Sequence, residues 1–241
     1  MLGEPLLKLE ITDSTNRVAL DWLDAPHGAA VVARVQTNGR GRLGRSWQSA
    51  ADTGLYLSLV LRHRAPDAAI YSLLSALGAA LALEKLTGLR CRLKWPNDVL
   101  TLSPTGEARK IGGILGEARG EKLVIGIGVN INQNRDELPD RPLFPASSLQ
   151  VESGREWEVE AVLQAILMEL DAIFTRFEEN EWEALRREFE RNCLGLGEVV
   201  RVGNGDATML GIFEGVGADG ALTLRTADGL QRILAGDVAY F

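Results

Sequence analysis

Cysteine and continuous apolar stretches are scarce in this sequence, and basic residues are outnumbered by acidic ones. The only cysteines, Cys91 and Cys193, lie far apart and in no paired motif. Disulfide frameworks and zinc sites need such motifs, so the sequence predicts neither. It predicts two buried thiols in a reducing compartment instead. The N-terminal residues carry acidic side chains among few apolar ones and lack the basic and apolar regions of a secretory signal. We therefore expect no export and a cytoplasmic location.

The most apolar window is also short. It runs from Ala68 to Leu83, between Asp67 and Glu84, and falls below the ~20 residues that a membrane helix needs. A buried helix is the better interpretation. The formal net charge of −7 repels phosphate-rich partners, so neither DNA nor a membrane surface is an expected partner. With 241 residues, 46% of them hydrophobic, the chain can bury the core of one large and one small domain.

The hydrophobic pattern predicts a sheet with helices packed on it. Short β-branched or alternating runs indicate strands, a Pro-Thr-Gly turn indicates a hairpin, and apolar residues at spacings of three and four indicate helices. The predicted strands are 30–36, 55–62, 91–96 and 122–132, the hairpin is 99–118 with its turn at Ser103–Gly106, and the helices are 16–23, 67–86, 156–178 and 180–191.

After Gly195 the pattern changes to short strands separated by glycine turns. The segments are EVVRV, MLGIFEGV, ALTLRT and QRILAGDVAY, with turns at residues 203–205, 219–220 and 228–229. Such a series predicts a small β barrel of SH3 type. We place the domain boundary near residue 194, which gives a catalytic domain at 1–194 and a C-terminal domain at 195–241.

Residues 39–46, Gly-Arg-Gly-Arg-Leu-Gly-Arg-Ser, have the glycine spacing of a dinucleotide fingerprint and nearly that of a P-loop. Both motifs need a helix that begins at the last glycine, whereas here the chain continues into a strand. A flexible loop would explain the glycines but not the arginines, and RNA-binding arginine–glycine segments are repetitive. The remaining interpretation is a loop that closes over an anion through Arg40, Arg42 and Arg45, with Trp47 covering a base or ring.

Polar residues gather near the ends of the predicted strands. Lys110 opens an apolar strand whose Gly112 and Gly113 leave room for a ligand, although a lysine in this position commonly faces solvent. Asp98 follows the strand 91–96, and it could pair with a lysine, bind magnesium or simply form a turn.

Two more segments have a structural and a functional interpretation. Gly126 and Gly128 leave one face of a strand bare beside Asn130, which suits either a ligand or a bulged strand. Ser14, Thr15 and Asn16 suit a helix cap, and a helix start also presents unpaired donors to a ligand.

Six motifs in register resemble those of the biotin–protein ligase family. They are DSTN at 13–16, QTNGRGRLGRSW at 36–47, LYLSLVL at 55–61, KWPNDVL at 94–100, KIGGILGE at 110–117 and GIGVNIN at 126–132. The resemblance implies an α+β fold with a mixed sheet, of class II aminoacyl-tRNA-synthetase type, and a C-terminal SH3-like domain. Some members add an N-terminal DNA-binding domain, and because DSTN begins at residue 13 we expect the form without it.

The resemblance also implies which residues bind the substrates. The catalytic residues would be Lys110 and Arg42. The predicted biotin site, with the bare glycines included, consists of Ser14, Thr15, Asn16, Gln36, Gly39, Arg40, Gly41, Arg42, Lys110, Gly113 and Gly126. The predicted ATP site consists of Arg45, Trp47, Asp98 and Asn130, while the metal ligands stay unassigned.

The implied reaction uses biotin, ATP and Mg²⁺ to form biotinyl-5'-AMP and then transfers biotin to a lysine of the biotin carboxyl carrier protein. The loop of residues 38–48 would order over the mixed anhydride and be disordered without ligand. A homodimer through an edge strand would fit the family. Two alternatives stay open, a lipoate–protein ligase and a non-catalytic biotin sensor.

Overall fold

The computed structural model describes residues 1–62, 68–139, 144–204 and 207–240. Its larger sheet has seven strands in the order β1-β2-β3-β7-β6-β5-β4. The β1–β2 pair is parallel and the other pairs are antiparallel, which confirms the predicted mixed sheet. The strands are β1 (Leu6–Thr12), β2 (Ala30–Gln36), β3 (Gly54–Arg62), β4 (Cys91–Lys94), β5 (Asp98–Leu102), β6 (Ala108–Arg119) and β7 (Lys122–Asn130).

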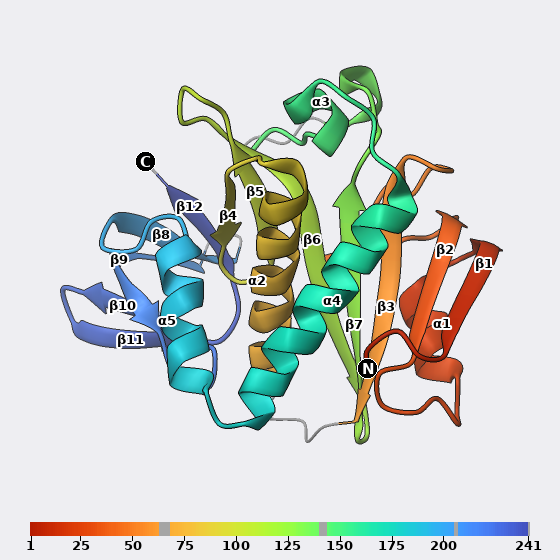
Figure 1. Cartoon of the computed structure of the whole chain (residues 1–241). Helices are drawn as coiled ribbons and strands as arrows, with labels where there is room; N and C mark the ends of the chain where they lie inside the picture. Colours follow the sequence, from red (N-terminus) through yellow and green to blue (C-terminus); the bar gives the residue numbers. More distant parts are fainter. Residues whose placement is uncertain (63–67, 140–143, 205–206, 241) are drawn as a thin grey trace.

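Helices cover both faces of this sheet unequally. The long helices α2 (Ala68–Thr87) and α4 (Val159–Glu178) cross one face, and α5 (Trp182–Asn192) lies toward the C-terminal strands (Figure 1). The short α1 (Thr15–Asp21) packs on the other face through a separate apolar cluster that includes Ala19, Val60 and Val124. Since α1 is short, it leaves part of this face of the sheet uncovered, and a site can form there.

Strand alternation decides which residues meet the long helices. On β3, Leu55, Leu57, Leu59 and Leu61 all belong to the main core, and on β7 the odd-numbered residues from 123 to 129 do the same. Because side chains alternate between faces, the even-numbered residues of both strands point to the opposite face. That face carries the polar side chains and the glycines.

Helix α2 confirms the predicted buried helix, although Asp67, its expected first residue, lies outside the described part. With 20 residues it is longer than the apolar window suggested, and by length and mean hydropathy (1.4) it could span a membrane. It is instead a core helix, since 67% of its apolar window is buried. Tyr71, Leu74 and Leu77 are fully buried between the sheet and α4.

The C-terminal strands form a second, five-stranded antiparallel sheet in the order β11-β10-β9-β8-β12. Its edges β11 and β12 are not hydrogen-bonded to each other among the described residues, so the SH3-like barrel is not closed. The strands are β8 (Val199–Asn204), β9 (Ala207–Val216), β10 (Leu222–Thr226), β11 (Gly229–Ile233) and β12 (Asp237–Tyr240).

The prediction of one strand for QRILAGDVAY was wrong. Its first part pairs with β10 and its last part with β8, so residues 234–236 must carry the chain from one edge of the sheet to the other. The strand β1 and the short helix α3 (Leu149–Ser153) were not predicted, and α4 and α5 begin at Val159 and Trp182, a few residues later than expected.

The two sheets share one continuous apolar core, which includes Leu93 from the first and Val200 and Phe213 from the second. Polar contacts add to it. The indole of Trp95 donates to the carbonyl oxygen of Gly220 at 3.1 Å, and Glu190 on α5 accepts from the backbone of Val216 at 2.8 Å. The C-terminal sheet is therefore held against α2, β4 and α5.

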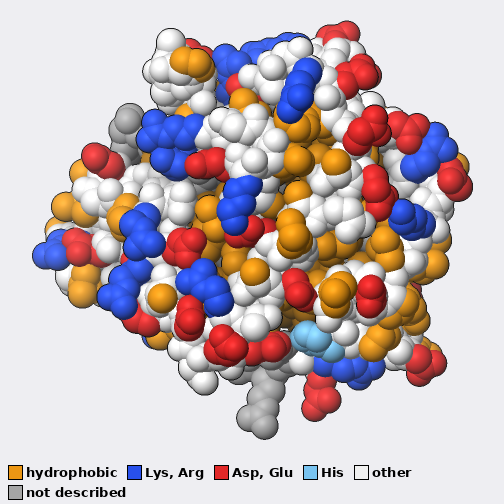
Figure 2. Space-filling model, in the orientation of Figure 1, with side chains coloured by type: hydrophobic (Ala, Val, Ile, Leu, Met, Phe, Trp, Pro, Cys, Tyr) orange, Lys and Arg blue, Asp and Glu red, His pale blue; other side chains and the backbone are white. Residues whose placement is uncertain are grey.

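Acidic and basic side chains are interspersed over the face shown in Figure 2, with apolar side chains between them. This face presents no broad field of one sign to a charged partner.

Candidate functional site

The floor of the site is the face of the larger sheet that α1 leaves uncovered. Strand register brings Tyr56 of β3, Gly128 of β7, Gly113 of β6 and Asp98 of β5 into one cross-strand row. The neighbouring row contains Ser58, Gly126 and Leu115. A pocket that is partly open to solvent lies over both rows. The glycines of these rows leave space above the sheet that larger side chains would fill.

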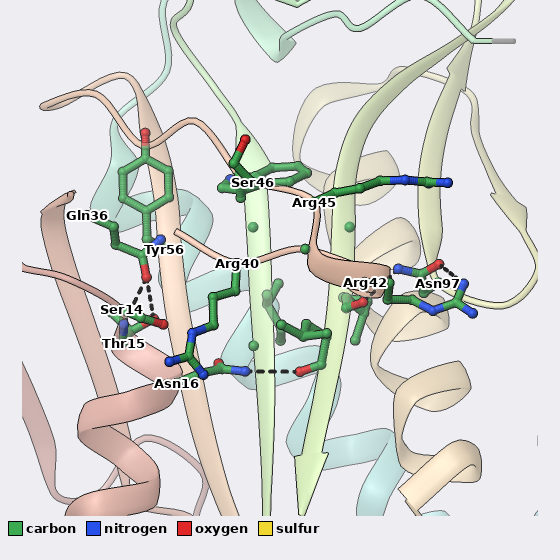
Figure 3. A pocket seen from close by; sticks show the side chains of 18 of the residues that line it. Ser14, Thr15, Asn16, Gln36, Arg40, Arg42, Arg45, Ser46, Tyr56 and Asn97 are labelled. Atoms are coloured by element: carbon green, nitrogen blue, oxygen red, sulfur yellow. Dashed lines mark hydrogen bonds between the residues drawn. The ribbon is translucent and has the colours of Figure 1, made fainter. Parts of the chain in front are cut away.

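The first turn of α1 forms one wall of the pocket. Ser14, Thr15 and Asn16 are each at most 4% exposed and line the pocket (Figure 3). Ser14 occupies the N-cap position, but its side chain makes no capping hydrogen bond, so only the position of the predicted cap is correct. Gln36 of β2 fixes Thr15, because its Oε1 accepts from the backbone nitrogen at 2.8 Å and from Oγ1 at 3.0 Å.

Two glycines of β7 are required by their neighbours. A Cβ at Gly126 would collide with the side chain amide of Asn16, and a Cβ at Gly128 would lie 2.6 Å from the indole ring of Trp47. The interpretation of this segment as a bulged strand is wrong, since both β3 and β6 pair with it in regular register. The bare strand instead receives Asn16 at one position and Trp47 at the next.

The arginine loop, residues 38–48 between β2 and β3, folds back on itself. The backbone of Gly41 donates to Arg45 at 2.6 Å, and that of Trp47 donates to Gly39 at 2.8 Å. A short 3-10 turn at Arg42–Gly44 stands where a nucleotide-binding motif would begin a longer helix. This geometry fits neither the dinucleotide fingerprint nor the P-loop.

Gly39 does not line the main pocket, unlike its predicted neighbours Arg40, Gly41 and Arg42. It lines a groove between the loop and strand β6, and a Cβ there would collide with the carbonyl oxygen of Trp47. Its observed role is therefore to allow this close backbone approach. The other predicted biotin residues all line the main pocket.

Arg42 and Arg45 contact residues of both sheets. Arg42 donates to Oδ1 of Asn97 at 3.0 Å, on the side of the pocket opposite to α1 (Figure 3), and burial lowers its pKa. Arg45 donates to Oδ2 of Asp237 at 2.5 Å, and Arg42 lies 3.9 Å from Oδ1 of the same carboxylate. The C-terminal sheet thus supplies a carboxylate to the pocket.

The charge of Asp237 is stabilised by its surroundings. Burial disfavours the carboxylate, but the hydrogen bond from Arg45 and the charges of Lys94, Arg45 and Arg42 hold its pKa below the usual range. Sequence reasoning missed Asp237, because nothing in the strand pattern of the C-terminal domain indicated that this residue reaches the pocket.

Lys110 enters the pocket beside Asp98. Its ammonium hydrogen-bonds Oδ1 of Asp98, while Lys94 lies 3.7 Å from Oδ2. Of the three interpretations of Asp98, the lysine partner is therefore the one observed. Two hydrogen bonds fix the backbone of Lys110. Its nitrogen donates to the carbonyl oxygen of Pro145 at 2.9 Å, and its carbonyl oxygen accepts from the nitrogen of Ser147 at 2.8 Å. The solvent-facing interpretation of Lys110 is wrong, because its side chain is only 13% exposed.

A second pocket adjoins the first at Gln36, Lys110 and Trp47. The ammonium of Lys110 lies 5.7 Å from the centroid of the Trp47 ring, and the buried Nε1 of that ring has no hydrogen-bond partner among the described residues. Asn130 lines the second pocket only, and its Nδ2 donates to Ser147 at 2.9 Å. The predicted ATP residues therefore divide, with Arg45 and Asp98 in the first pocket, Asn130 in the second and Trp47 in both.

The described residues contain no group of three or more His, Cys, Asp or Glu side chains that could hold a metal ion. Sequence reasoning also missed Ser58 and Glu117, which hydrogen-bond pocket residues. Ser58 shares strand parity with Tyr56, and Glu117 shares it with Gly113, so parity was the available signal.

Comparison with known proteins places this geometry in a family. Residues 9–134 match the model of the Biotin/lipoate A/B protein ligase family, and residues 195–239 match that of the Biotin protein ligase C terminal domain. The biotin--[acetyl-CoA-carboxylase] ligase of Paracoccus denitrificans is 34% identical over 95% of this chain and 98% of its own length. The bifunctional ligase/repressor BirA of Bacillus spizizenii is 31% identical over 99% of this chain and 74% of its own length.

A solved structure agrees with these relatives. The biotin protein ligase of Aquifex aeolicus in complex with biotin and ATP superposes with a TM-score of 0.82 at 33% identity, covering 97% of each chain. The matched segments include the arginine loop, Lys110 and the glycine rows of the floor. This chain belongs to the Biotin/lipoate A/B protein ligase family.

Proposed function

We propose that this protein is an ATP-dependent biotin–protein ligase, which makes biotinyl-5'-AMP and transfers biotin to a lysine of a biotin carboxyl carrier protein. The observation that carries the proposal is the place of Lys110, a fixed cation where two pockets meet. One pocket has the predicted biotin residues and the other has Asn130. The names of the relatives and the biotin and ATP complex of the Aquifex ligase support the same activity.

The first pocket offers two kinds of surface to a ligand. At the α1 end, neutral hydroxyl and amide groups of Ser14, Thr15 and Asn16 suit a ring that carries both N–H and C=O groups, as the ureido ring of biotin does. At the other end, Lys110 and Arg42 suit a carboxylate. Biotin bound in this direction would place its carboxylate beside the second pocket.

In the first step the biotin carboxylate would attack the α-phosphorus of ATP, forming a C–O–P bond while pyrophosphate leaves. Lys110 and Arg42 would bring two anions together and stabilise the charge that develops between them. In the second step the amine of an acceptor lysine would attack the biotin carbonyl carbon, with AMP as the leaving group. Closure of the arginine loop would keep water from the anhydride between the steps.

The residues of the pocket do not suit a resident metal. Both oxygens of Asp98 already face lysines, and the described residues offer no cluster of metal ligands. Magnesium commonly binds through substrate phosphates with few protein ligands. Mg²⁺ would accordingly arrive with ATP as part of the substrate, and the roles of Lys110 and Arg42 do not depend on it.

We also retain as proposals a cytoplasmic location, the absence of DNA binding and a homodimer through an edge strand. Both cysteines are free and buried, and burial raises the pKa of each to about 12, which suits thiols that stay reduced and unreactive. Strand β1 is at one edge of the larger sheet and could pair with a second copy.

Pyrophosphate release in the presence of ATP and one carboxylic acid tests the function. We expect release with biotin and none above background with lipoate, followed by transfer of biotin to a purified carrier domain. Release with lipoate alone would assign the protein to lipoate ligation, which the family model also covers. Tight binding of biotin without any pyrophosphate release would indicate a sensor.

A further inference from the structure

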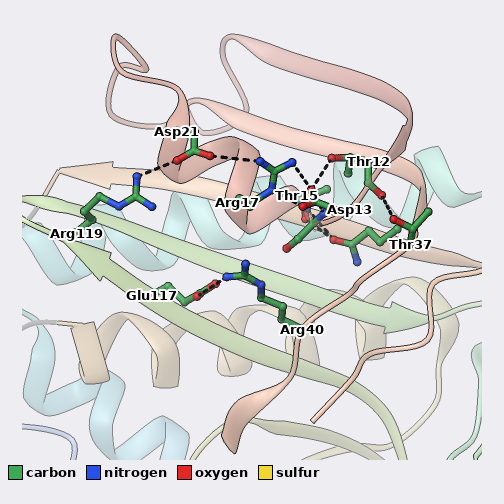
Figure 4. A network of polar contacts seen from close by, with 11 residues as sticks. Thr12, Asp13, Thr15, Arg17, Asp21, Thr37, Arg40, Glu117 and Arg119 are labelled. Carbon is green, nitrogen blue, oxygen red and sulfur yellow. Dashed lines mark hydrogen bonds and ion pairs between the residues drawn. The ribbon is translucent and has the colours of Figure 1, made fainter. Parts of the chain in front are cut away.

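Glu117, near the end of β6, joins the floor of the pocket to the arginine loop. Its Oε2 accepts from Nδ2 of Asn16 at 2.8 Å, and its Oε1 accepts from Nη1 of Arg40 at 3.2 Å. Figure 4 shows Arg40 reaching from the loop to this carboxylate. The Glu117 side chain is 26% exposed and that of Arg40 is 40% exposed, so the ion pair is partly screened.

The carboxylate determines which way the Asn16 amide points. Its Nδ2 faces two acceptors, Glu117 and the carbonyl oxygen of Leu115 at 3.3 Å, so its Oδ1 must face the other way. There Oδ1 contacts the Ser58 hydroxyl at 2.6 Å. Without the carboxylate one of the two acceptors would be lost, and the amide could turn over.

The hydrogen bonds continue from Asn16 back to the arginine loop. The Ser58 hydroxyl, fully buried, lies 2.8 Å from Oγ1 of Thr15, and Thr15 contacts Gln36. Gln36 donates to Ser49 at 2.9 Å, and Ser49 donates to the carbonyl oxygen of Trp47 at 3.3 Å. The network therefore starts at Arg40 in the loop, crosses the floor and returns to the loop at Trp47.

The direction of this network is restricted at Ser58. A hydroxyl has one proton, so Ser58 can donate either to Thr15 or to Asn16, but not to both. The orientation that Glu117 imposes on Asn16 leaves Oδ1 as an acceptor, which draws the Ser58 proton to Asn16. Thr15 also has one hydroxyl proton, which it can give to Ser58 or to Gln36 but not to both, and Oε1 of Gln36 keeps the backbone N–H of Thr15 in either case.

We infer that Glu117 is a positioning residue for biotin, which orients Asn16 and holds Arg40 over the same end of the pocket. The inference rests on the proposed function and deepens it. Glu117 does not line the main pocket, so it acts through these two residues. Its direct partners, Asn16 and Arg40, line the main pocket and not the second one, so its main influence is on the binding of biotin.

The sign of the expected effect separates positioning from general electrostatics. Removing a negative charge near the pocket would by itself strengthen the binding of anionic biotin. Loss of a positioned amide and guanidinium would weaken it. A variant that binds biotin less tightly after losing the carboxylate therefore acts through geometry.

The test is Glu117→Gln, which keeps the shape, removes the charge and leaves a single acceptor oxygen, so that the side chain can accept from Asn16 or from Arg40 but not from both. We expect biotin affinity in the absence of ATP, measured by calorimetry, to fall about tenfold, since charge-assisted hydrogen bonds are lost at a partly exposed site. The KM for biotin should rise by a similar factor, with the KM for ATP and kcat unchanged. A uniform loss of kcat and thermal stability, with unaltered biotin affinity, would overturn the inference.

The matched control is Asp21→Asn. Asp21 belongs to the same group of polar contacts (Figure 4) and pairs with Arg17 and Arg119, but it touches no residue of the pocket. We expect its biotin affinity to equal that of the wild type. An equal loss in both variants would overturn the specific role of Glu117.

A double-mutant cycle with Arg40→Gln tests the route. If Glu117 acts partly through Arg40, the double variant should lose less affinity than the product of the two single losses. Strict additivity with unchanged Asn16 amide chemical shifts in Glu117→Gln would overturn the inference. The wild type is the check on the proposed function. If the wild type does not bind biotin, both the proposed function and the role of Glu117 are overturned. If the wild type and Glu117→Gln bind biotin equally well, only the role of Glu117 is overturned.

Discussion

Asp98 lies between two ammonium groups, which gives this part of the pocket its net charge. Lys94 is 7% exposed in its side chain and Lys110 13%, so both are largely withdrawn from water. Among the described residues, Lys94, Lys110, Arg42 and Arg45 together face only two carboxylates, Asp98 and Asp237, which leaves a surplus of positive charge. An incoming carboxylate or phosphate would supply the missing negative charge in a site where charges are poorly screened.

Replacement of Lys110 tests this surplus at the scale of one residue. In Lys110→Ala, we expect pyrophosphate exchange into ATP to fall by roughly 10²–10³-fold, the usual cost of removing one donor that stabilises developing charge. The circular dichroism spectrum should not change. Lys85→Ala is the control, because Lys85 is 67% exposed and pairs with Glu169 on another helix. Normal exchange in Lys110→Ala would contradict the assignment.

Asp237 supports a prediction on pH. Its pKa is lowered in the folded protein, so its carboxylate contributes stability at neutral pH, and this contribution is lost as the pH falls through the folded pKa, below the usual ~3.9. In urea, Asp237→Asn should unfold with a free energy about 1 kcal/mol lower at pH 7, after allowance for solvent screening. The difference from the wild type should be constant between about pH 5 and 8. It should shrink in stronger acid, and a difference that grows there would contradict the sign.

At the scale of elements, the arginine loop and α2 differ in how many of their residues are buried. None of Arg42, Leu43 and Gly44 is buried in the short turn of the loop, whereas most residues of α2 are buried. The loop is held mainly by polar contacts of its arginines, which a ligand could replace. Segments with few buried apolar contacts open most readily, so the loop is suited to close over a ligand.

Hydrogen exchange at residues 38–48 tests the expected ordering of the loop. We expect these amides to exchange rapidly without ligand and at least about tenfold more slowly with biotin and a non-hydrolysable ATP analogue, because closure would protect them. Amides of α2 serve as the internal reference and should not change. Equal protection of the loop with and without ligands would argue against closure.

Helix α2 depends on a glycine for its contact with α4. A Cβ at Gly78 would lie 2.5 Å from Leu170, which is 0% exposed, and 3.3 Å from Ile173. In Gly78→Val the helices would have to separate or the buried side chains adopt strained rotamers, which costs about 1–3 kcal/mol in the free energy of unfolding. Chemical denaturation measures this cost. Gly88→Ala, at an uncrowded position beyond the helix with a φ of +75°, measures instead the cost of backbone strain without crowding.

At the scale of the whole molecule, the apolar core runs through both sheets. Trp95 of the first sheet reaches Gly220 near the second, and Glu190 of α5 holds Val216. Asp237 in turn places a carboxylate of the C-terminal sheet against the arginine loop. Packing therefore couples the C-terminal sheet both to the core and to the pocket.

This continuity predicts cooperative unfolding. By differential scanning calorimetry the whole chain should unfold in one transition, with calorimetric and van't Hoff enthalpies that agree within error. Two resolved transitions, one of them assignable to residues 195–241, would show that the junction is too weak to couple the parts.

The local pattern of the sequence determined most elements and many pocket residues. Periodicity identified α2, α4 and the strands β2, β3 and β7, because alternation and helical spacing are short-range properties. The motifs that resemble biotin–protein ligases indicated Lys110, Arg42 and the first turn of α1. Strand β1 was missed, because its burial is uneven and its apolar residues are mixed with the exposed Lys8 and Glu10.

Tertiary structure alone decided how these residues combine. Several contacts of the pocket join residues that are far apart in the chain. They are the pairing of Asp98 with Lys110, the contacts of Glu117 with Asn16 and Arg40, and the pairing of Asp237 with Arg45. The sequence by itself determined the chemistry of each side chain and its local conformation. Only strand register and the packing of the second sheet brought those charges within hydrogen-bonding distance, since such contacts depend on where the whole chain places its backbone.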